Sequence, residues 1–366
     1  MKLSRCISAI GLIITCLLLS ACHKVAQDVA ISQHGNFNEA IAEASSKEIL
    51  LNTIRAHKHK APSFLTISSI TTSNSYNSPS ISISQNGFKG ANFFANTEGS
   101  ISSYGVEYQP NITLIPNSGE EYANRLLNPL SLRDIGTIAY AENNIGLLLR
   151  LTASKVGPWV NYPPLPNEHH IAQVIADEKN FQAFCELLQS VYAENGHQLF
   201  FRSLATDRNK TGKIESEYDR FFTMIIPIKQ PAHFTQQELK LLQPLHIDNT
   251  SKVIQFAQIT HLGNDMIGIK SRTLVSTLKY LSSLIKDVPQ SASISQIQPL
   301  LSRNFFSIYS SKQRPENSYL SIKYDGLWFY IKDNDTASKE TFEALELLFN
   351  ITRIVPQSNS TVLVSG

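Results

Sequence analysis

The sequence predicts an α+β fold, in which antiparallel sheets and hairpins pack with several helices. Apolar residues recur at helical spacing in long segments, for example Leu274, Leu278 and Leu281. β-branched and aromatic residues alternate in short segments, and residues 319–331 contain two such runs joined by Asp325-Gly326. Asp-Gly adopts the positive φ angles that a two-residue hairpin turn requires. Long helices mixed with antiparallel hairpins are typical of α+β proteins, and the sequence has no repeat that would indicate a solenoid or propeller.

Helices and strands alternate irregularly in the first half of the chain. The helical pattern predicts a first helix over residues 38–56, ended by Pro62, and a helix over 131–142 capped by Ser131. The other expected elements of this half are helices over 145–155 and 177–194, and strands over 64–70 and 106–115.

The second half contains more strands. Thr235 is placed to cap a short helix, and an apolar stripe predicts a helix over 273–286. A terminal helix is expected from about 337 to 352. The expected strands are residues 198–204, 220–228, 253–259 and 266–269, with the Asp-Gly hairpin.

The N-terminus has the composition of a cleaved signal peptide. Lys2 and Arg5 precede an uncharged apolar run that is too short for a comfortable membrane span. The run ends in Leu19-Ser20-Ala21-Cys22, which resembles the lipobox of bacterial lipoproteins. The resemblance implies cleavage before Cys22 and acylation, palmitate included, of that cysteine. An uncleaved anchor helix or an ordinary secretory signal is the alternative interpretation.

These features predict the domain organisation and the location. Residues 1–21 form the signal peptide, and residues 22–35 a tether between lipid and body. The body divides into an N-terminal part, 36–230, with a Ser/Asn/Gly-rich insertion at 71–105, and a C-terminal part, 231–366. Cys22 is followed by His23 and Lys24 instead of aspartate, which resembles lipoproteins sorted to the outer membrane, with the periplasmic face expected.

Charge and cysteine content narrow the chemistry. The chain has 32 Lys and Arg against 30 Asp and Glu, and loss of Lys2 and Arg5 leaves it close to neutral, so nucleic acid is not an expected partner. After lipidation of Cys22 only Cys185 remains in the mature body, which excludes an intrachain disulfide there. A buried, inert thiol is favoured for Cys185 over a reactive nucleophile.

Several blocks together resemble a family of uncharacterised proteobacterial lipoproteins. They are Leu50–Arg55 with Pro62–Leu65, Ile115–Ala123, Lys270–Leu274 with Val288-Pro289, and Tyr324–Phe342. The blocks spread in order over nearly the whole mature chain. The family brings no activity and therefore no catalytic residues. Ala56-His57-Lys58-His59 departs from the apolar-aromatic and acidic run expected after Arg55.

Metal sites are weakly indicated. Asp207, Asn209 and Thr211 match the first ligand positions of a calcium-binding EF-hand loop, but Tyr218 occupies the position of the bidentate glutamate, so a polar hairpin loop is favoured. His57 and His59 end a helical pattern, and a metal at these residues or at His169-His170 is the lesser interpretation. Helix capping by Asp335 or Thr336 accounts for Asp333-Asn334-Asp335. No cofactor is expected.

Aromatic residues supply the candidate binding residues Trp159, Tyr162, Trp328 and Tyr330. Core and cross-strand packing is the favoured interpretation of these rings. The leading functional hypothesis is a non-catalytic accessory or scaffold subunit that contacts an envelope protein. A glycan- or peptidoglycan-binding module is the second hypothesis, and an enzyme of unfamiliar type is the third, since the sequence lacks common hydrolase motifs.

Overall fold

A computed structural model describes residues 38–76, 81–83, 99–101, 106–161, 171–203, 222–259, 266–286 and 305–352 of the 366-residue chain. Leu19 to Cys22 and the tether predicted over residues 22–35 lie outside these residues. The described residues form two units, one of residues 38–62 and 123–352 and the other of residues 63–122. Among the described helices, none combines the length and apolar character needed to cross a membrane.

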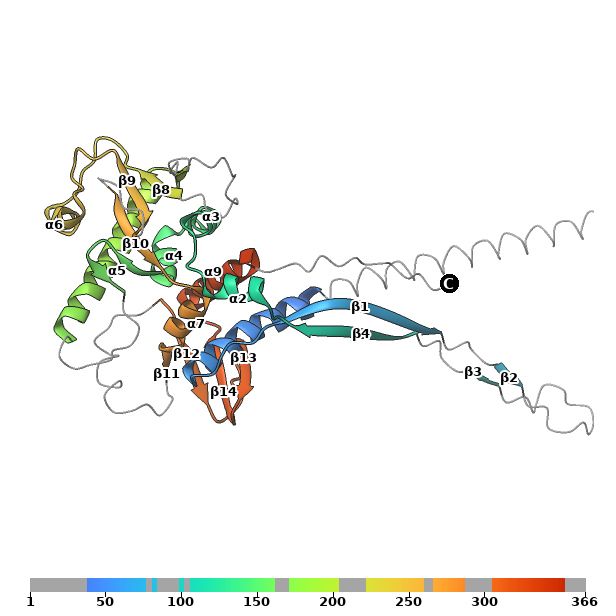
Figure 1. The fold of residues 1–366 in the computed structure, drawn as a ribbon. Coiled ribbons are helices and arrows are strands. Elements are labelled where there is room, and N and C mark those ends of the chain that lie inside the picture. Colours follow the sequence, from blue (N-terminus) through green and yellow to red (C-terminus); the bar gives the residue numbers. More distant parts are fainter. Residues whose placement is uncertain are drawn as a thin grey trace, which may run out of the picture. The chain divides into compact units, whose positions relative to one another are not determined.

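The smaller unit is a long two-stranded ribbon. Strand β1 (Leu65–Tyr76) pairs antiparallel with β4 (Val106–Pro116), with one irregularity between Ile67 and Ser69 (Figure 1). Strands β2 (Ile81–Ile83) and β3 (Gly99–Ile101) form a second short pair. The predicted strands are confirmed. The first is longer than expected, because residues 71–76 of the Ser/Asn/Gly-rich segment continue the ladder with β4.

The larger unit contains a mixed six-stranded sheet in the order β6-β5-β10-β9-β8-β7. Only β9 and β10 pair in parallel, and the other neighbours are antiparallel. The sheet draws strands from both sides of residue 230. Its strands are β5 (Ala153–Val156), β6 (Trp159–Val160), β7 (Phe200–Ser203), β8 (Phe222–Pro227), β9 (Val253–Gln258) and β10 (Ile267–Ser271).

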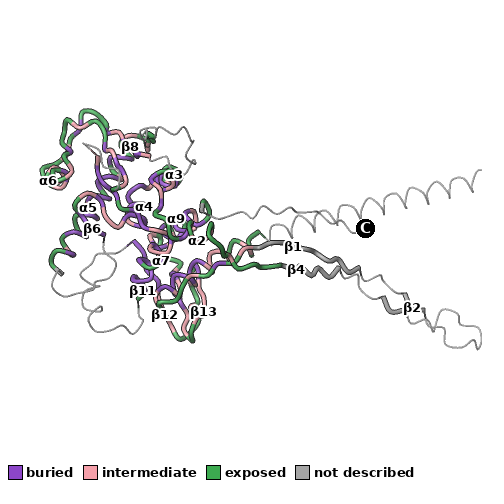
Figure 2. Tube along the Cα trace, in the orientation of Figure 1, coloured by how far each residue is buried: buried purple, intermediate pink, exposed green. Residues whose placement is uncertain are grey.

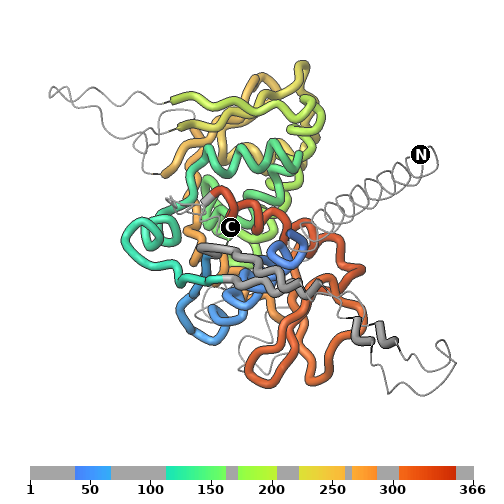
Figure 3. Tube along the Cα trace, turned by 90° about the vertical axis from the view of Figure 1, so that its right-hand side faces the viewer, coloured from blue at the N-terminus to red at the C-terminus, as the bar shows by residue number. Residues whose placement is uncertain are grey.

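Helices pack against this sheet through aromatic contacts. The Phe184 ring of α5 (Ile171–Glu194) lies 5.4 Å from the Trp159 ring of β6 and 6.3 Å from the Phe256 ring of β9, measured between centroids. Figure 3 shows the teal to green helices alongside the yellow and orange strands. The other helices of this region are α2 (Glu120–Leu127), α3 (Leu132–Glu142), α4 (Ile145–Thr152), α6 (Gln236–Leu242) and the 3₁₀ turn η3 (Gln243–Leu245).

Two predicted helix caps are present. The Ser131 hydroxyl accepts from the Asp134 amide at the start of α3. Thr235 and Glu238 form a reciprocal capping box on α6. The end expected for the helix over 145–155 is wrong: α4 stops at Thr152, because residues 153–156 form β5 and pair with β10.

A four-stranded sheet in the order β11-β12-β14-β13 completes the larger unit. The Asp-Gly hairpin is confirmed, with φ of 51° at Asp325 and 80° at Gly326 between β13 and β14. The helix expected over 273–286 ends at Ser282, because Ile285 and Lys286 pair in parallel with β12. The elements are α7 (Leu274–Ser282), β11 (Ile285–Lys286), β12 (Ile308–Ser311), β13 (Ser318–Tyr324), β14 (Leu327–Lys332) and α9 (Thr336–Thr352).

The buried residues of the larger unit come from both sheets and their helices, as the purple segments in Figure 2 show. The first helix, described over residues 38–57, buries Leu50 and Ile54 completely, and α9 buries Phe342 and Leu345. The chain therefore has the α+β fold that its sequence predicts.

One buried cation, Arg272 at the end of β10, connects several of these elements. Its guanidinium donates to the carbonyl oxygens of Ala153 and Asn161, each at 2.6 Å, and to those of Arg150 and Leu151 at 3.3 Å. The carbonyls of Arg150 and Leu151 belong to the last turn of α4, where the helix dipole favours a cation. The guanidinium carbon also lies 3.8 Å from the centre of the Tyr280 ring of α7.

Main-chain hydrogen bonds of Arg272 connect further segments at the same place. The Arg272 amide donates to the Thr152 carbonyl at 2.6 Å, and its own carbonyl accepts from the Leu130 amide at 3.0 Å. The Asn161 side-chain amide donates to Arg150 and Ala153 carbonyls. Since Arg272 is only 3% exposed, these bonds form away from water, where an unsatisfied carbonyl is costly.

We expect the substitution Arg272→Met to lower the free energy of unfolding by about 3 kcal/mol or more, because it removes the guanidinium hydrogen bonds to four carbonyl oxygens in a buried site. Lys270→Met is the matched control, since Lys270 is an exposed cation on the same strand, and it should change stability by no more than about 0.5 kcal/mol. Urea unfolding followed by circular dichroism measures both. Equal stabilities of the two variants would contradict this role of Arg272.

Candidate functional site

The structure separates the four predicted aromatic binding residues. Trp159 is 5% exposed and packs on Phe184, as the core-packing interpretation expects. Trp328 and Tyr330 belong to β14 in the other sheet and are half-buried. Tyr162 lies outside the described residues. The structure therefore does not bring Trp159 together with the other two rings.

Trp328 and Tyr330 share the outward side of the four-stranded sheet. Alternation along β14 buries Phe329 and Ile331 completely on the opposite side. The register places Tyr309 of β12 directly opposite Tyr330, with ring centroids 5.8 Å apart. Three partly exposed rings thus lie on two neighbouring strands.

Cations are interleaved with these rings. The Lys332 Nζ lies 3.8 Å from the centre of the Tyr309 ring, and the Lys286 Nζ lies 5.4 Å from the same ring. The Arg314 guanidinium carbon lies 5.5 Å from the Trp328 ring, and Lys323 is opposite Trp328 in register. We call this set the aromatic–cationic face; it consists of Lys286, Tyr309, Arg314, Lys323, Trp328, Tyr330 and Lys332.

The four cations of the aromatic–cationic face make no ion pair with a carboxylate within the described part of the chain. Neighbouring acids are engaged elsewhere: Asp325 lies 3.9 Å from Lys58, and Asp333 lies 3.1 Å from Lys339. Lys286, Arg314 and Lys323 are exposed and Lys332 is half-buried. The face therefore presents positive charge that these carboxylates do not neutralise.

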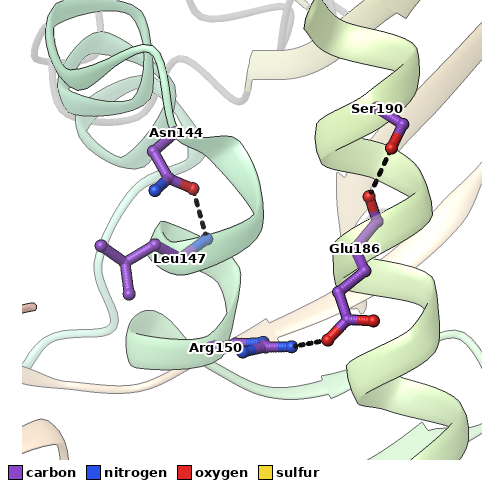
Figure 4. A network of polar contacts seen from close by, with 5 residues as sticks. All are labelled: Asn144, Leu147, Arg150, Glu186 and Ser190. Atoms are coloured by element: carbon purple, nitrogen blue, oxygen red, sulfur yellow. Dashed lines mark hydrogen bonds and ion pairs between the residues drawn. The ribbon is translucent and has the colours of Figure 1, made fainter. Parts of the chain in front are cut away.

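Two grooves flank helix α5. One, of about 680 Å³, lies between α4, α5 and the start of α9, and Figure 4 shows its polar contacts. There the Arg150 Nη2 lies 2.8 Å from the Glu186 Oε1, the Ser190 hydroxyl donates to the Glu186 carbonyl, and Asn144 caps α4 at the Leu147 amide. Of these contacts, the Arg150–Glu186 ion pair joins α4 to α5, and the other two each lie within one helix.

The second groove, of about 500 Å³, lies between α5 and α6. Its lining includes Trp159, Leu187 and Leu241 together with the charged Glu186 and Lys240. Trp159 contributes little accessible surface there because it is almost fully buried. A third groove, of about 620 Å³, lies beside β13 and is lined by Arg314, Tyr319 and Glu43 among others.

Cys185 does not have the environment of a nucleophile. It is 1% exposed, and burial raises the pKa of its thiol to about 12, with Arg150 opposing the shift and Glu186 adding to it. The thiol is therefore protonated at neutral pH. The expectation of a buried, inert cysteine is confirmed.

Within the described residues, the candidate metal ligands predicted from the sequence do not form a metal-binding cluster. Asp207, Asn209 and Thr211 lie outside the described residues, as do His169 and His170. The His57 Nδ1 lies 3.0 Å from the Ser282 carbonyl, and burial lowers the pKa of this histidine. Asp335 caps α9 through the Ser338 amide, as predicted. Searching the described ranges finds no group of three or more His, Cys, Asp or Glu placed to hold a metal ion.

A second charged surface is acidic. Glu340 and Glu343 of α9 raise the pKa of Glu142, although burial is the largest cause of that shift. Burial also raises the pKa of Glu346, while its hydrogen bond from Ser46 of the first helix acts in the opposite direction. The larger unit therefore has an acidic surface, formed by Glu142, Glu340, Glu343 and Glu346, whose charge is opposite to that of the aromatic–cationic face.

Sequence reasoning identified Trp328 and Tyr330 but missed Tyr309 and the cations beside them. Tyr309 lies in a four-residue strand, β12, whose pattern is too short to be recognised. Lys332 was recognisable in principle, because it continues the period-two alternation of Trp328 and Tyr330.

Comparison of the chain with protein-family models, with curated proteins and with solved structures finds no match.

The buried thiol predicts a pH dependence of stability. In the unfolded chain the Cys185 thiol ionises near its ordinary pKa of 9.0, whereas in the folded chain it keeps its proton to about 12. Between pH 9.0 and about 12 the unfolded state binds fewer protons than the folded state. The contribution of the Cys185 thiol to the free energy of unfolding therefore falls by about 1.4 kcal/mol per pH unit as pH rises.

The comparison with Cys185→Ala isolates this contribution, because other groups titrate equally in both proteins. In a chain that begins at residue 22 and carries Cys22→Ser, the difference in unfolding free energy between the Cys185 protein and Cys185→Ala should narrow as pH rises above 9.0. Urea unfolding at neutral and alkaline pH measures it. A difference that is independent of pH would contradict the thiol's raised pKa.

Proposed function

We propose that this chain is a lipid-anchored protein of the bacterial envelope, held at the periplasmic face of the outer membrane. The support is the lipobox-like run ending at Cys22, with Lys2 and Arg5 before it and no aspartate after it. One acyl chain anchors a protein only marginally, so more than one on Cys22 would give a stable attachment.

Within the envelope, the protein acts as a non-catalytic accessory or scaffold subunit that binds a protein partner. The observation that carries this proposal is the two-stranded ribbon of β1 and β4. An isolated pair of strands is only marginally stable in water. Within the described residues each strand has one neighbour, so each has a second edge with backbone groups able to pair with another strand.

The two edges of the ribbon differ in sequence. Residues 65–76 of β1 contain no charged residue and no proline, the two devices that most often prevent pairing at an edge. β4 contains Pro110 and Pro116, which lack the amide that a ladder needs. The β1 edge is therefore the better acceptor, and addition of a partner strand is the mode of binding that fits it.

The settings of three groups described above support a non-catalytic role. Cys185 is protonated, Asp335 caps a helix and Glu186 is paired with Arg150. Glycan binding is the second candidate function, favoured by the outward placement of Trp328 and Tyr330 on one sheet face. An enzyme of unfamiliar type remains the third.

Photo-crosslinking in the native cells tests the ribbon. A benzophenone amino acid at Ser73 of β1 should give one discrete adduct with an envelope protein, because a partner strand would lie within reach. The matched control is the same amino acid at Gln236, an exposed polar position on α6, where no such adduct is expected. Equal labelling at both positions, or none at Ser73, would exclude the β1 edge as the binding site.

The variant Cys22→Ser tests the anchor in the same cells. We expect it to abolish incorporation of labelled palmitate and to release the protein from the membrane fraction. The Ser73 adduct should then become much weaker, because partner and protein no longer share a surface. An unchanged membrane fraction without palmitate would refute lipid anchoring while leaving the ribbon result intact.

A further inference from the structure

The aromatic–cationic face has no role in the binding mode proposed for the ribbon, yet its composition is specific. Two lysines, Lys286 and Lys332, lie against the single ring of Tyr309. No described carboxylate forms an ion pair with either lysine. An anion that approaches this ring is therefore attracted by two positive charges at once.

The same geometry disfavours a neutral sugar as the ligand. A sugar ring stacks on the open face of an aromatic side chain, but Lys332 already lies over Tyr309 and Arg314 lies near the Trp328 ring. Stacking of a sugar on these rings would displace both cation–π contacts. An anion approaching the same surface keeps the cation–π contacts and gains attraction from the cations.

We propose that the aromatic–cationic face binds the anionic phospholipid headgroups of a membrane surface. Trp and Tyr rings combined with Lys and Arg are the side chains that the interface of a bilayer favours. The outward surface of a sheet suits a planar ligand, and none of the three grooves described above is lined by Tyr309, Trp328 or Tyr330. The inference rests on the proposed function, since acylation at Cys22 would bring this unit to a membrane.

Vesicle flotation with the unlipidated chain tests the proposal. A chain that begins at residue 22 with Cys22→Ser should bind vesicles of phosphatidylcholine and phosphatidylglycerol, and should not bind phosphatidylcholine alone. The triple variant Lys286→Gln, Arg314→Gln and Lys332→Gln should weaken binding on the order of 100-fold, because each cation near an anionic surface contributes about 1 kcal/mol. Raised salt should weaken binding as well.

A matched control removes the same charge from elsewhere in the larger unit. Lys179, Lys229 and Lys252 are exposed and lie outside the aromatic–cationic face. Their triple replacement by Gln changes the net charge equally, and we expect it to keep most of the vesicle binding. Far-ultraviolet circular dichroism and urea unfolding confirm that both triple variants fold.

Tryptophan fluorescence supplies a second readout. The chain has two tryptophans, and Trp159 is buried beneath α5. Brominated phosphatidylglycerol should therefore quench Trp328 selectively. The substitution Trp328→Phe should abolish the quenching, because it removes the reporter, and this assigns the signal to Trp328.

Three results would overturn the proposal: no binding to the anionic vesicles, equal loss in the two triple variants, or flotation without quenching of Trp328. Binding to soluble polygalacturonate with no binding to vesicles would also overturn it and assign the face to an acidic glycan. Because the assay uses a chain that cannot be acylated, its outcome is independent of palmitate labelling at Cys22. Failure of the anchor and failure of this surface are therefore distinguishable.

Discussion

The larger unit depends on the buried guanidinium of Arg272. Its planar set of five donors reaches carbonyls at the end of α4, at the start of β5 and in Asn161 after β6, while its face lies on Tyr280 of α7. A lysine has a single ammonium group and could not satisfy carbonyls that arrive from several directions. The position of Arg272 directly after β10 thereby fixes how the six-stranded sheet meets α4 and α7.

The four-stranded sheet uses one strand pattern for two purposes. Alternation along β14 directs Phe329 and Ile331 into the core and Trp328 and Tyr330 outward. The buried side holds the sheet in place and thereby keeps the outward rings in fixed positions. Lys286 and Lys332 lie near the Tyr309 ring and Arg314 lies near the Trp328 ring, which gives this side of the sheet positive charge. The alternation of side chains along β14 therefore supplies both the buried residues that stabilise the sheet and the aromatic residues of its outward side.

The ribbon obeys a different constraint. Its ladder of backbone hydrogen bonds is long, and within the described residues each of its two strands has one neighbouring strand. A pair of strands by itself is only marginally stable in water, so pairing with a further strand would stabilise it. The ribbon and the aromatic–cationic face differ in chemistry, which is why we propose a protein strand as the ligand of the first and an anionic membrane surface as the ligand of the second.

The sequence by itself determined the features that depend on neighbours in the chain. Ser131 and Thr235 cap their helices, Asp325-Gly326 makes the hairpin turn, and the α+β class follows from the two periodicities. These were predictable because a cap or a turn involves only a few consecutive residues. The site was predictable only in part: Trp328 and Tyr330 were candidate binding residues, although packing was the favoured interpretation of their rings, and Tyr309 was not a candidate.

Only the tertiary structure decided where helices stop and which side chains meet. α4 ends at Thr152 and α7 at Ser282 because the next residues pair with strands that are distant in sequence, and this gain outweighs helical propensity. Tyr309 faces Tyr330 because of the register between β12 and β14. Arg272 is buried because carbonyls from separate segments converge on it. Contacts of this kind depend on long-range geometry, which local patterns do not encode.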